Sequence, residues 1–233
     1  MSIPILPPDV NESHRDFTVT GDQIRFGLAA VKNVGEAAIE VILREKEEKG
    51  RFGSLYDFCR RVDLRKVNRR VIESLIKCGA FDFSRTHRSQ MLAVLEEIIE
   101  RAQGDQRKRD ATQMSMWGNP PGEKEESYPD MEEFPESQLI IFEKETIGFY
   151  NSRHPLSAYQ EEIKRWSEED TSVLPQLPNG QEVKICGLVS SLKEIVTKKG
   201  DRMAFLNLED MKGFVEVILF PEVFKSASSC LRS

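Results

Sequence analysis

Residues 28–44, LAAVKNVGEAAIEVILR, decide how the first half of this 233-residue chain folds. Their apolar side chains recur with the period of a helix, which predicts a helix over residues 35–49 that ends at Gly50. The side of this helix that faces a core is expected to hold Ala37, Ala38, Val41 and Ile42.

A polar turn, Lys32-Asn33-Val34-Gly35, separates this helix from the short apolar segment before it. We expect Gly35 to permit a positive φ angle and to let another backbone come close. Backbone N–H groups at the start of a helix, with Lys32 beside them, favour the binding of a phosphate. The pattern is typical of a helix-hairpin-helix, which grips nucleic-acid backbone without reading bases. An ordinary αα-hairpin without a ligand is the alternative.

Composition indicates a folded, soluble chain with room for one large domain or two small ones, since 39% of its residues are hydrophobic and 31% are charged. No apolar run is long enough to span a membrane, and residues 1–14 lack the basic and apolar regions of a secretory signal. The four cysteines are widely separated and fit no zinc-site spacing, which favours reduced thiols. We therefore expect a cytoplasmic protein with no membrane partner and no metal.

The net charge of −6 is unevenly distributed along the chain. Residues 1–111 carry 20 basic and 18 acidic side chains, residues 112–182 carry 5 and 15, and residues 183–233 carry 8 and 6. Two slightly basic segments therefore flank an acidic one, and the overall charge does not exclude a nucleic-acid surface. The densest basic run, residues 51–70, has seven Lys or Arg side chains, a pattern also typical of a solvated face.

Turn and capping residues predict the other elements of the first half. Residues 17–26 alternate as a β-hairpin around Gly21-Asp22. Three helices follow: residues 54–61 with Ser54 as N-cap, residues 68–78 with Asn68 as N-cap and Gly79 after the end, and residues 87–103 ended by Gly104. Two helix pairs joined by turns can bury one shared face and present two phosphate sites on one side.

Residues 104–136 are rich in Gly, Pro, Ser and acidic side chains and are predicted to form a long loop. One apolar group interrupts this loop, Gln113-Met114-Ser115-Met116-Trp117. Met and Trp side chains in a solvated acidic loop favour a docking peptide, and the alternative is a staple that packs back onto the helices. Two helices, residues 136–150 and 156–166, are predicted next, with His154 between them as a structural hydrogen-bonding residue.

The hydrophobic period changes in the last part of the chain. Strands are predicted at residues 182–196, 203–208 and 214–220, followed by a helix that begins at Pro221. Gly187 permits a bend in the long first strand, and three antiparallel strands followed by a helix are the first part of an OB-fold. Too few residues remain after Phe220 for two further strands, so we expect the barrel to be incomplete.

Several motifs together give the chain a close resemblance to a known family. They are residues 7–13 (PPDVNES), 24–28 (IRFGL), 32–36 (KNVGE), 54–59 (SLYDFC), 75–82 (LIKCGAFD), 143–145 (EKE), 148–150 (GFY), 154–156 (HPL), 197–200 (TKKG), 203–205 (MAF), 208–210 (LED), 215–217 (VEV) and 220–221 (FP). With these motifs the chain resembles, over nearly its whole length, a carboxy-terminal section of the α subunit of bacterial DNA polymerase III, the replicative C-family polymerase.

The resemblance implies a multidomain α+β fold, in which a tandem helix-hairpin-helix lobe is followed by an incomplete OB-fold β-barrel. Its parts would be the end of the fingers region (1–26), the DNA-binding lobe (27–110), a loop with a clamp-binding peptide (111–135), a helical connector (136–170) and the start of the OB-fold (171–233). The lobe would bind double-stranded DNA, the OB-fold single-stranded template, and Gln113, Met114, Ser115, Met116 and Trp117 the sliding clamp. Other replisome subunits would be partners of the full-length protein.

The expected DNA contacts combine backbone amides, cations and aromatic rings. Those for duplex DNA are Lys32, Asn33, Val34, Gly35, Glu36, Lys77, Gly79, Arg85 and Arg88. Those for single-stranded DNA are Lys198, Lys199, Arg202, Phe205 and Phe214, whose rings would stack on bases. The chain departs from the family at Arg153, where Gly is usual, and in the second hairpin, residues 83–86, which lacks a glycine.

Nothing in the sequence indicates a catalytic centre. No pair of carboxylates has the setting for two-metal phosphoryl transfer, and no Gly-rich loop precedes Lys-Ser or Lys-Thr. In the family that the chain resembles, the polymerase carboxylates lie in a palm domain outside the section matched here, so we expect a non-catalytic piece without cofactors. Two alternatives stay open: a nuclease or lyase module of nucleic-acid repair built from the same parts, and a stand-alone protein-interaction module.

Overall fold

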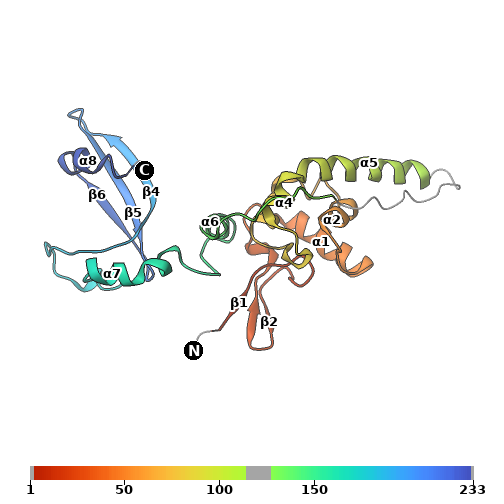
Figure 1. Cartoon of the computed structure of the whole chain (residues 1–233), viewed down its shortest axis with the longest axis horizontal. Helices are drawn as coiled ribbons and strands as arrows, with labels where there is room; N and C mark the ends of the chain where they lie inside the picture. The colour runs from red at the N-terminus through yellow and green to blue at the C-terminus, as the bar shows by residue number, and fades with distance from the viewer. Residues whose placement is uncertain (1–2, 114–126, 232–233) are drawn as a thin grey trace. The chain divides into compact units, whose positions relative to one another are not determined.

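The computed structural model describes residues 3–113 and 127–231, and the chain divides into two compact units, residues 1–152 and 153–233 (Figure 1). The first unit is mainly helical and carries a small sheet near its N-terminus, and the second is a sheet with short helices. The predicted helical connector contributes to both, because α6 (Glu136–Ile147) belongs to the first unit and α7 (Gln160–Trp166) to the second.

The first unit begins with a three-stranded sheet in the order β1-β3-β2. β2 (Thr18–Thr20) and β3 (Gln23–Arg25) pair antiparallel around a turn in which Gly21 has a φ of +60°, so the predicted hairpin is confirmed. β1 (Ile5–Leu6) pairs with β3 in parallel, although the prolines around it indicate a loop. Pro4 is tolerated next to this strand because it needs no N–H group there. Its carbonyl oxygen accepts a hydrogen bond from the N–H of Ile24 at 3.0 Å.

The first predicted helix pair is confirmed as the 3₁₀ turn η1 (Leu28–Ala30) and helix α1 (Glu36–Lys49). Gly35 is the N-cap of α1, and Gly50 follows its end with a φ of +76°. The expected core face is wrong at Ala37, which is exposed. The buried apolar side chains of α1 are Ala38, Ile39, Val41 and Ile42.

The conformation predicted for the turn is wrong at Gly35. Its φ is −80°, and nothing lies within 4 Å of the place a Cβ would occupy. Asn33 instead has the positive φ, +68°. Asparagine tolerates this left-handed region because its short polar side chain can form a local hydrogen bond.

Helices α2 (Leu55–Arg61) and α3 (Arg69–Lys77) begin at the predicted N-caps. The side chains of Ser54 and Asn68 each accept a backbone N–H three residues further along, at 3.1 and 3.2 Å. Gly79, one residue past the C-cap of α3, has a φ of +85°, which glycine adopts without strain.

The single helix predicted over residues 87–103 is wrong in its bounds. The structure has α4 (Arg88–Ala93), a break at Val94, and then α5 (Leu95–Gln113), which continues past Gly104. The loop predicted from residue 104 onwards is therefore helical in its first part.

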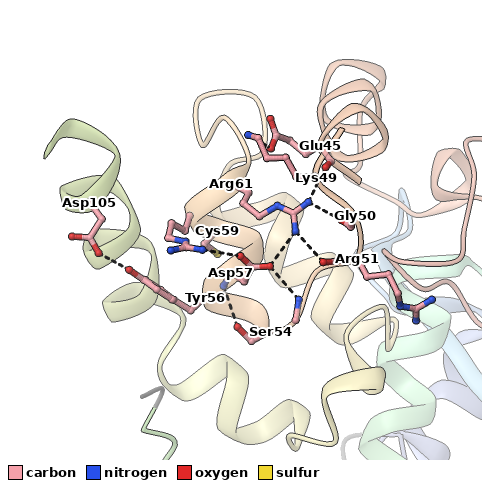
Figure 2. Close-up of polar contacts among 12 residues, drawn as sticks. Glu45, Lys49, Gly50, Arg51, Ser54, Tyr56, Asp57, Cys59, Arg61 and Asp105 are labelled. Carbon is pink, nitrogen blue, oxygen red and sulfur yellow. Dashed lines mark hydrogen bonds and ion pairs between the residues drawn. The ribbon is translucent and has the colours of Figure 1, made fainter. Parts of the chain in front are cut away.

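Tertiary contacts explain why Gly104 does not end α5. The side-chain amide of Gln106 donates to three backbone carbonyl oxygens at the end of α2, at 2.8 to 3.2 Å. The hydroxyl of Tyr56, in α2, donates to the carboxylate of Asp105 (Figure 2). These contacts outweigh the free-energy cost of a glycine inside a helix, which is about 1 kcal/mol relative to alanine.

The core of the first unit contains a row of phenylalanines. Phe52, Phe58 and Phe81 meet edge to face, with ring centroids 4.9 and 5.0 Å apart, and all three are fully buried. They join the segment after α1, helix α2 and the connection after α3. Helix α6 is confirmed but ends at Ile147, three residues before the predicted bound, because Gly148 adopts a φ of +89° as its C-cap.

Arg61 ties α2 to the end of α1 (Figure 2). Its guanidinium donates to the carbonyl oxygens of Glu45 and Gly50, both at 2.7 Å, and to that of Arg51 at 3.0 Å. The side chain is only 8% exposed and lies over the ring of Phe52, 4.3 Å from its centroid. One buried guanidinium thus links α2 to the last turn of α1 and to the two residues that follow this helix.

We expect Arg61→Ala to lower the free energy of unfolding of the first unit by about 2 kcal/mol, because three carbonyl oxygens lose a charged donor. Urea unfolding followed by circular dichroism at 222 nm measures the change. Arg65→Ala is the matched control, since the Arg65 side chain is 91% exposed and its removal should change stability by less than about 0.5 kcal/mol. Equal effects of the two substitutions would contradict the structural role of Arg61.

The second unit contains η3 (Pro155–Tyr159), α7, η4 (Leu174–Gln176) and an antiparallel sheet in the order β4-β5-β6. The bounds of the sheet and of the last helix are β4 Leu188–Val196, β5 Arg202–Glu209, β6 Phe214–Leu219 and α8 Pro221–Ala227. Three antiparallel strands and a helix from Pro221 are thereby confirmed, but β4 begins six residues later than predicted. Helix α8 packs against β5 and β6 (Figure 1). Its Phe224 side chain is buried.

A buried carboxylate fixes the turn between β5 and β6. Asp210 accepts the N–H and the hydroxyl of Thr171 at 2.7 and 2.6 Å, and the N–H groups of Lys212 and Gly213 at 2.7 and 2.9 Å. Burial opposes ionisation, but these hydrogen bonds prevail and hold the pKa of Asp210 below its ordinary value. The segment that follows α7 is thus attached to the sheet.

Candidate nucleic-acid interface

The first hairpin, residues 31–36, is anchored to two other helices of its unit. The N–H of Lys32 donates to the carbonyl oxygen of Thr146, in α6, at 2.7 Å. The side-chain amide of Asn33 donates to the hydroxyl oxygen of Ser74, in α3, at 3.0 Å. The side chains of Lys32 and Asn33 are otherwise exposed, so the turn is fixed in place while its outer surface stays open.

The N-terminus of α1 is uncapped. Gly35 offers no side chain, and in the described part of the chain the N–H groups of Gly35, Glu36 and Ala37 meet no acceptor. These amides lie at the positive end of a helix of 14 residues. An anion bound there would receive hydrogen bonds that the protein itself leaves unmade.

A cation from an earlier segment, Arg15, lies at this helix end. The Nε of Arg15 is 2.9 Å from a carboxylate oxygen of Glu36, so Arg15 offsets the one negative charge in the first turn of α1. The carbonyl oxygen of Arg15 accepts the N–H of Ala29 at 3.0 Å. A Cβ on Gly27 would collide with the backbone at Arg15, so Gly27 is the residue that permits a close backbone approach.

The second hairpin, residues 83–86, and the residues that flank it, 79–82 and 87–89, offer few free amides because most of their N–H groups donate within the protein. Those that do so belong to Gly79, Ala80, Asp82, Ser84, Arg85, Thr86, His87, Arg88 and Ser89. The position where the sequence lacks the expected glycine is taken by Arg85, which adopts a φ of +60°.

A carboxylate from a distant segment occupies the N-terminus of α4. Glu133 accepts the N–H of Arg88 at 2.7 Å, that of Ser89 at 3.1 Å and that of Phe134 at 2.8 Å. Burial raises the pKa of Glu133, but the three amides and the nearby His87 outweigh it and lower the pKa below its ordinary value. The internal carboxylate therefore takes the hydrogen bonds that a phosphate would need.

The cations expected at the second hairpin differ in whether their charges are already paired within the protein. Arg88 is committed internally, since its guanidinium bonds Asp82 at 2.6 and 3.1 Å and the carbonyl oxygen of Lys77 at 2.9 Å. The ammonium of Lys77 is 2.9 Å from Glu73. Gly79 serves this packing, because a Cβ there would collide with the guanidinium of Arg88. Arg85 alone is exposed without an ion pair to any described residue.

In the second unit, strand register brings two of the expected aromatic residues to one face of the sheet. Phe205 is paired with Ile218, and Phe214 is paired with Glu209, which lies four residues after Phe205 and so on the same face. Phe214 is 75% exposed. Lys193, paired with Phe205 across β4, adds a cation to this face that sequence reasoning missed.

The expected cations of the second unit are not gathered on that face. Arg202 lies on the opposite side of the sheet by strand alternation, forms an ion pair with Glu194 and lies 6.0 Å from the ring centroid of Phe224. Lys198 and Lys199 are exposed in the turn between β4 and β5.

The predicted docking peptide lies almost wholly outside the described residues. Gln113 is the last residue of α5, and Met114, Ser115, Met116 and Trp117 belong to the range that the structure leaves undescribed. Its role therefore stays a prediction.

Residues 3–113 and 127–231 hold neither a candidate metal site nor a candidate membrane-spanning helix. No cluster of three or more His, Cys, Asp or Glu side chains there could hold a metal ion. No helix in the same ranges is long and apolar enough to cross a membrane. No disulfide joins the four cysteines, all of which lie in the described ranges, and burial raises the pKa of the Cys78 thiol to about 12. His154 caps η3 by accepting the N–H of Leu156 at 3.2 Å, which confirms its structural role.

An anchored turn followed by an uncapped helix is the geometry of a helix-hairpin-helix, and the family of helix-hairpin-helix motifs matches residues 2–91. Along nearly its whole length the chain is also similar to DNA polymerase III subunit alpha of several bacteria. It is 34% identical to that of Pseudomonas aeruginosa, with 100% of this chain and 21% of the relative covered. The corresponding values are 38%, 99% and 20% for Bacillus subtilis, and 35%, 95% and 20% for Escherichia coli. The chain belongs to the DNA polymerase III α-subunit family and spans about one fifth of the length of these relatives.

Proposed function

We propose that the chain is a DNA-binding section of a replicative polymerase in the cytoplasm, and that its first hairpin holds the backbone of double-stranded DNA. The observation that carries this proposal is the uncapped N-terminus of α1, with Arg15 paired to its first turn and Lys32 exposed in the turn before it. The match of residues 2–91 to helix-hairpin-helix motifs supports it. Amides and cations of this kind bind phosphate oxygens and read no bases, so binding is independent of sequence.

The two hairpins contribute unequally in this proposal. The first supplies free N–H groups and two cations, whereas Glu133 fills the N-terminus of α4 and Arg88 is held by Asp82. We therefore limit the second hairpin to a contact by Arg85. Lys77, Gly79 and Arg88 support the fold around it.

We expect Lys32→Glu to weaken duplex binding about tenfold at low salt, because a cation at a phosphate is replaced by an anion. The loss should be the same for unrelated DNA sequences, and the slope of log K against log salt should fall by about 1. Fluorescence anisotropy with two labelled duplexes at several salt concentrations measures both quantities.

Lys225→Glu, at an exposed position of α8, changes the net charge by the same amount and is the control. It should leave duplex binding within twofold of the wild type. Salt-independent binding, or a Lys32 variant that changes sequence preference, would contradict backbone recognition.

Two further contacts complete the proposal. The face that carries Phe205 and Phe214 would stack on bases of single-stranded template, as the start of an OB-fold, with Lys193, Lys198 and Lys199 along the backbone. Gln113 to Trp117 would tether the chain to the sliding clamp, and other replisome subunits would join it in the full-length protein. The section itself carries out no catalysis.

A further inference from the structure

Helix α3 carries a cation that sequence reasoning did not assign to any site, Arg70. It lies four residues before Ser74, and residues separated by four positions are neighbours on one face of a helix. Ser74 accepts the side-chain amide of Asn33 at 3.0 Å, so this face of α3 is held directly against the first hairpin. Arg70 therefore lies about one helical turn, roughly 5.4 Å along α3, from the residue that anchors the hairpin.

Of the three cations in α3, Arg69 and Lys77 are already paired with described carboxylates, and Arg70 is not. Arg69 forms an ion pair with Glu96 at 3.1 Å, and Lys77 forms one with Glu73 at 2.9 Å. The side chain of Arg70 is exposed, and no acidic group of the described residues lies within ion-pair distance of it. Its guanidinium is free to bind an external anion.

We propose that Arg70 binds a second phosphate of the duplex, next to the phosphate that the first hairpin holds. One turn of α3 is comparable to the step between neighbouring phosphates of one DNA strand, and the guanidinium fork matches two phosphate oxygens. The inference rests on the proposed function of the first hairpin and extends it. The DNA backbone then runs from α1 along α3 toward the start of α3, and it avoids the negative charge that Glu133 and Asp82 place near the other end of this helix.

Arg70→Ala in the full chain tests this path. Duplex binding measured by fluorescence anisotropy should weaken about five- to tenfold at low salt, and the slope of log K against log salt should fall by about 1. Arg70→Lys keeps the charge and should recover most of the affinity. Arg69→Ala is the matched control on the same helix, and it should change the affinity less than twofold because its charge is already paired with Glu96.

The outcomes separate this inference from the function on which it rests. If Lys32→Glu weakens binding while Arg70→Ala equals Arg69→Ala, the path along α3 is wrong and the hairpin site stands. If the wild-type chain binds no duplex, the proposed function fails and the inference fails with it. Thermal unfolding of each variant must match the wild type, and Arg70→Lys supplies the comparison if Arg70→Ala lowers the midpoint.

Discussion

Asp210→Ala is expected to lower the free energy of unfolding of the second unit by about 3 to 4 kcal/mol. Its carboxylate accepts four hydrogen bonds, two of them from Thr171, and it is 9% exposed. Removal leaves buried donors unsatisfied and detaches the segment before β4 from the turn that joins β5 to β6. Hydrogen exchange followed by mass spectrometry should show faster exchange in β5 and β6.

The ionisation of Asp210 gives this effect a pH dependence. Its pKa is lowered in the folded protein, so the stabilisation is complete above the ordinary value of 3.8 and is lost as the pH falls through the folded value. Asp210→Asn should remove this acid-dependent part. Asp201→Ala, at an exposed aspartate in the turn after β4, is the control and should leave exchange unchanged. Equal protection in the Asp210 and Asp201 variants would contradict the role of this carboxylate.

Replacing Met116 and Trp117 together by Ala is expected to abolish clamp binding, with at least a hundredfold loss of affinity. Adjacent large apolar side chains fill a pocket as anchors, and Gln113, with a donor and an acceptor, fixes the register at a polar rim. A short peptide with few anchors binds with modest affinity, on the order of micromolar, so loss of both anchors leaves no measurable binding. Surface plasmon resonance against immobilised clamp measures the change.

Two measurements on the same variant distinguish a docking peptide from a structural staple. Duplex binding and the thermal midpoint should both stay at wild-type values. A paired substitution of Glu125 and Glu126 by Ala, in the same acidic stretch, is the control for clamp binding and should weaken it less than threefold. If the Met116 and Trp117 variant unfolds instead, the peptide is a staple and the clamp proposal is wrong.

Local chemistry made much of the fold predictable. Ser54 and Asn68 are N-caps because their side chains accept an N–H within the next turn, and Gly50 and Gly79 follow helix ends because they adopt positive φ. Strand alternation gave the three strands of the second unit in the same way. Each of these signals depends on residues a few positions apart.

Contacts between distant segments could not be predicted in the same way. Gly104 indicates a helix end, yet Gln106 and Asp105 bind α2 and keep α5 helical. Arg88 carries a guanidinium group that could bind a phosphate, yet this group is already paired with the carboxylate of Asp82. Arg15 reaches the first hairpin only because residues 14–16 pack against Gly27 and the start of η1. Charge alone did not indicate which cations were free.

Residues 129–133 are attached to the start of α4 by hydrogen bonds, and this attachment has a consequence for engineering the chain. Gln90 donates to the carbonyl oxygen of Pro129 and Ser89 to that of Glu132, both at 2.7 Å, while Gln106 fixes α5 on α2. Both flanks of residues 114–126 are thus held by one body, independently of the covalent link between them. A fluorophore tag inserted between these two flanks should therefore leave both of them attached to the first unit.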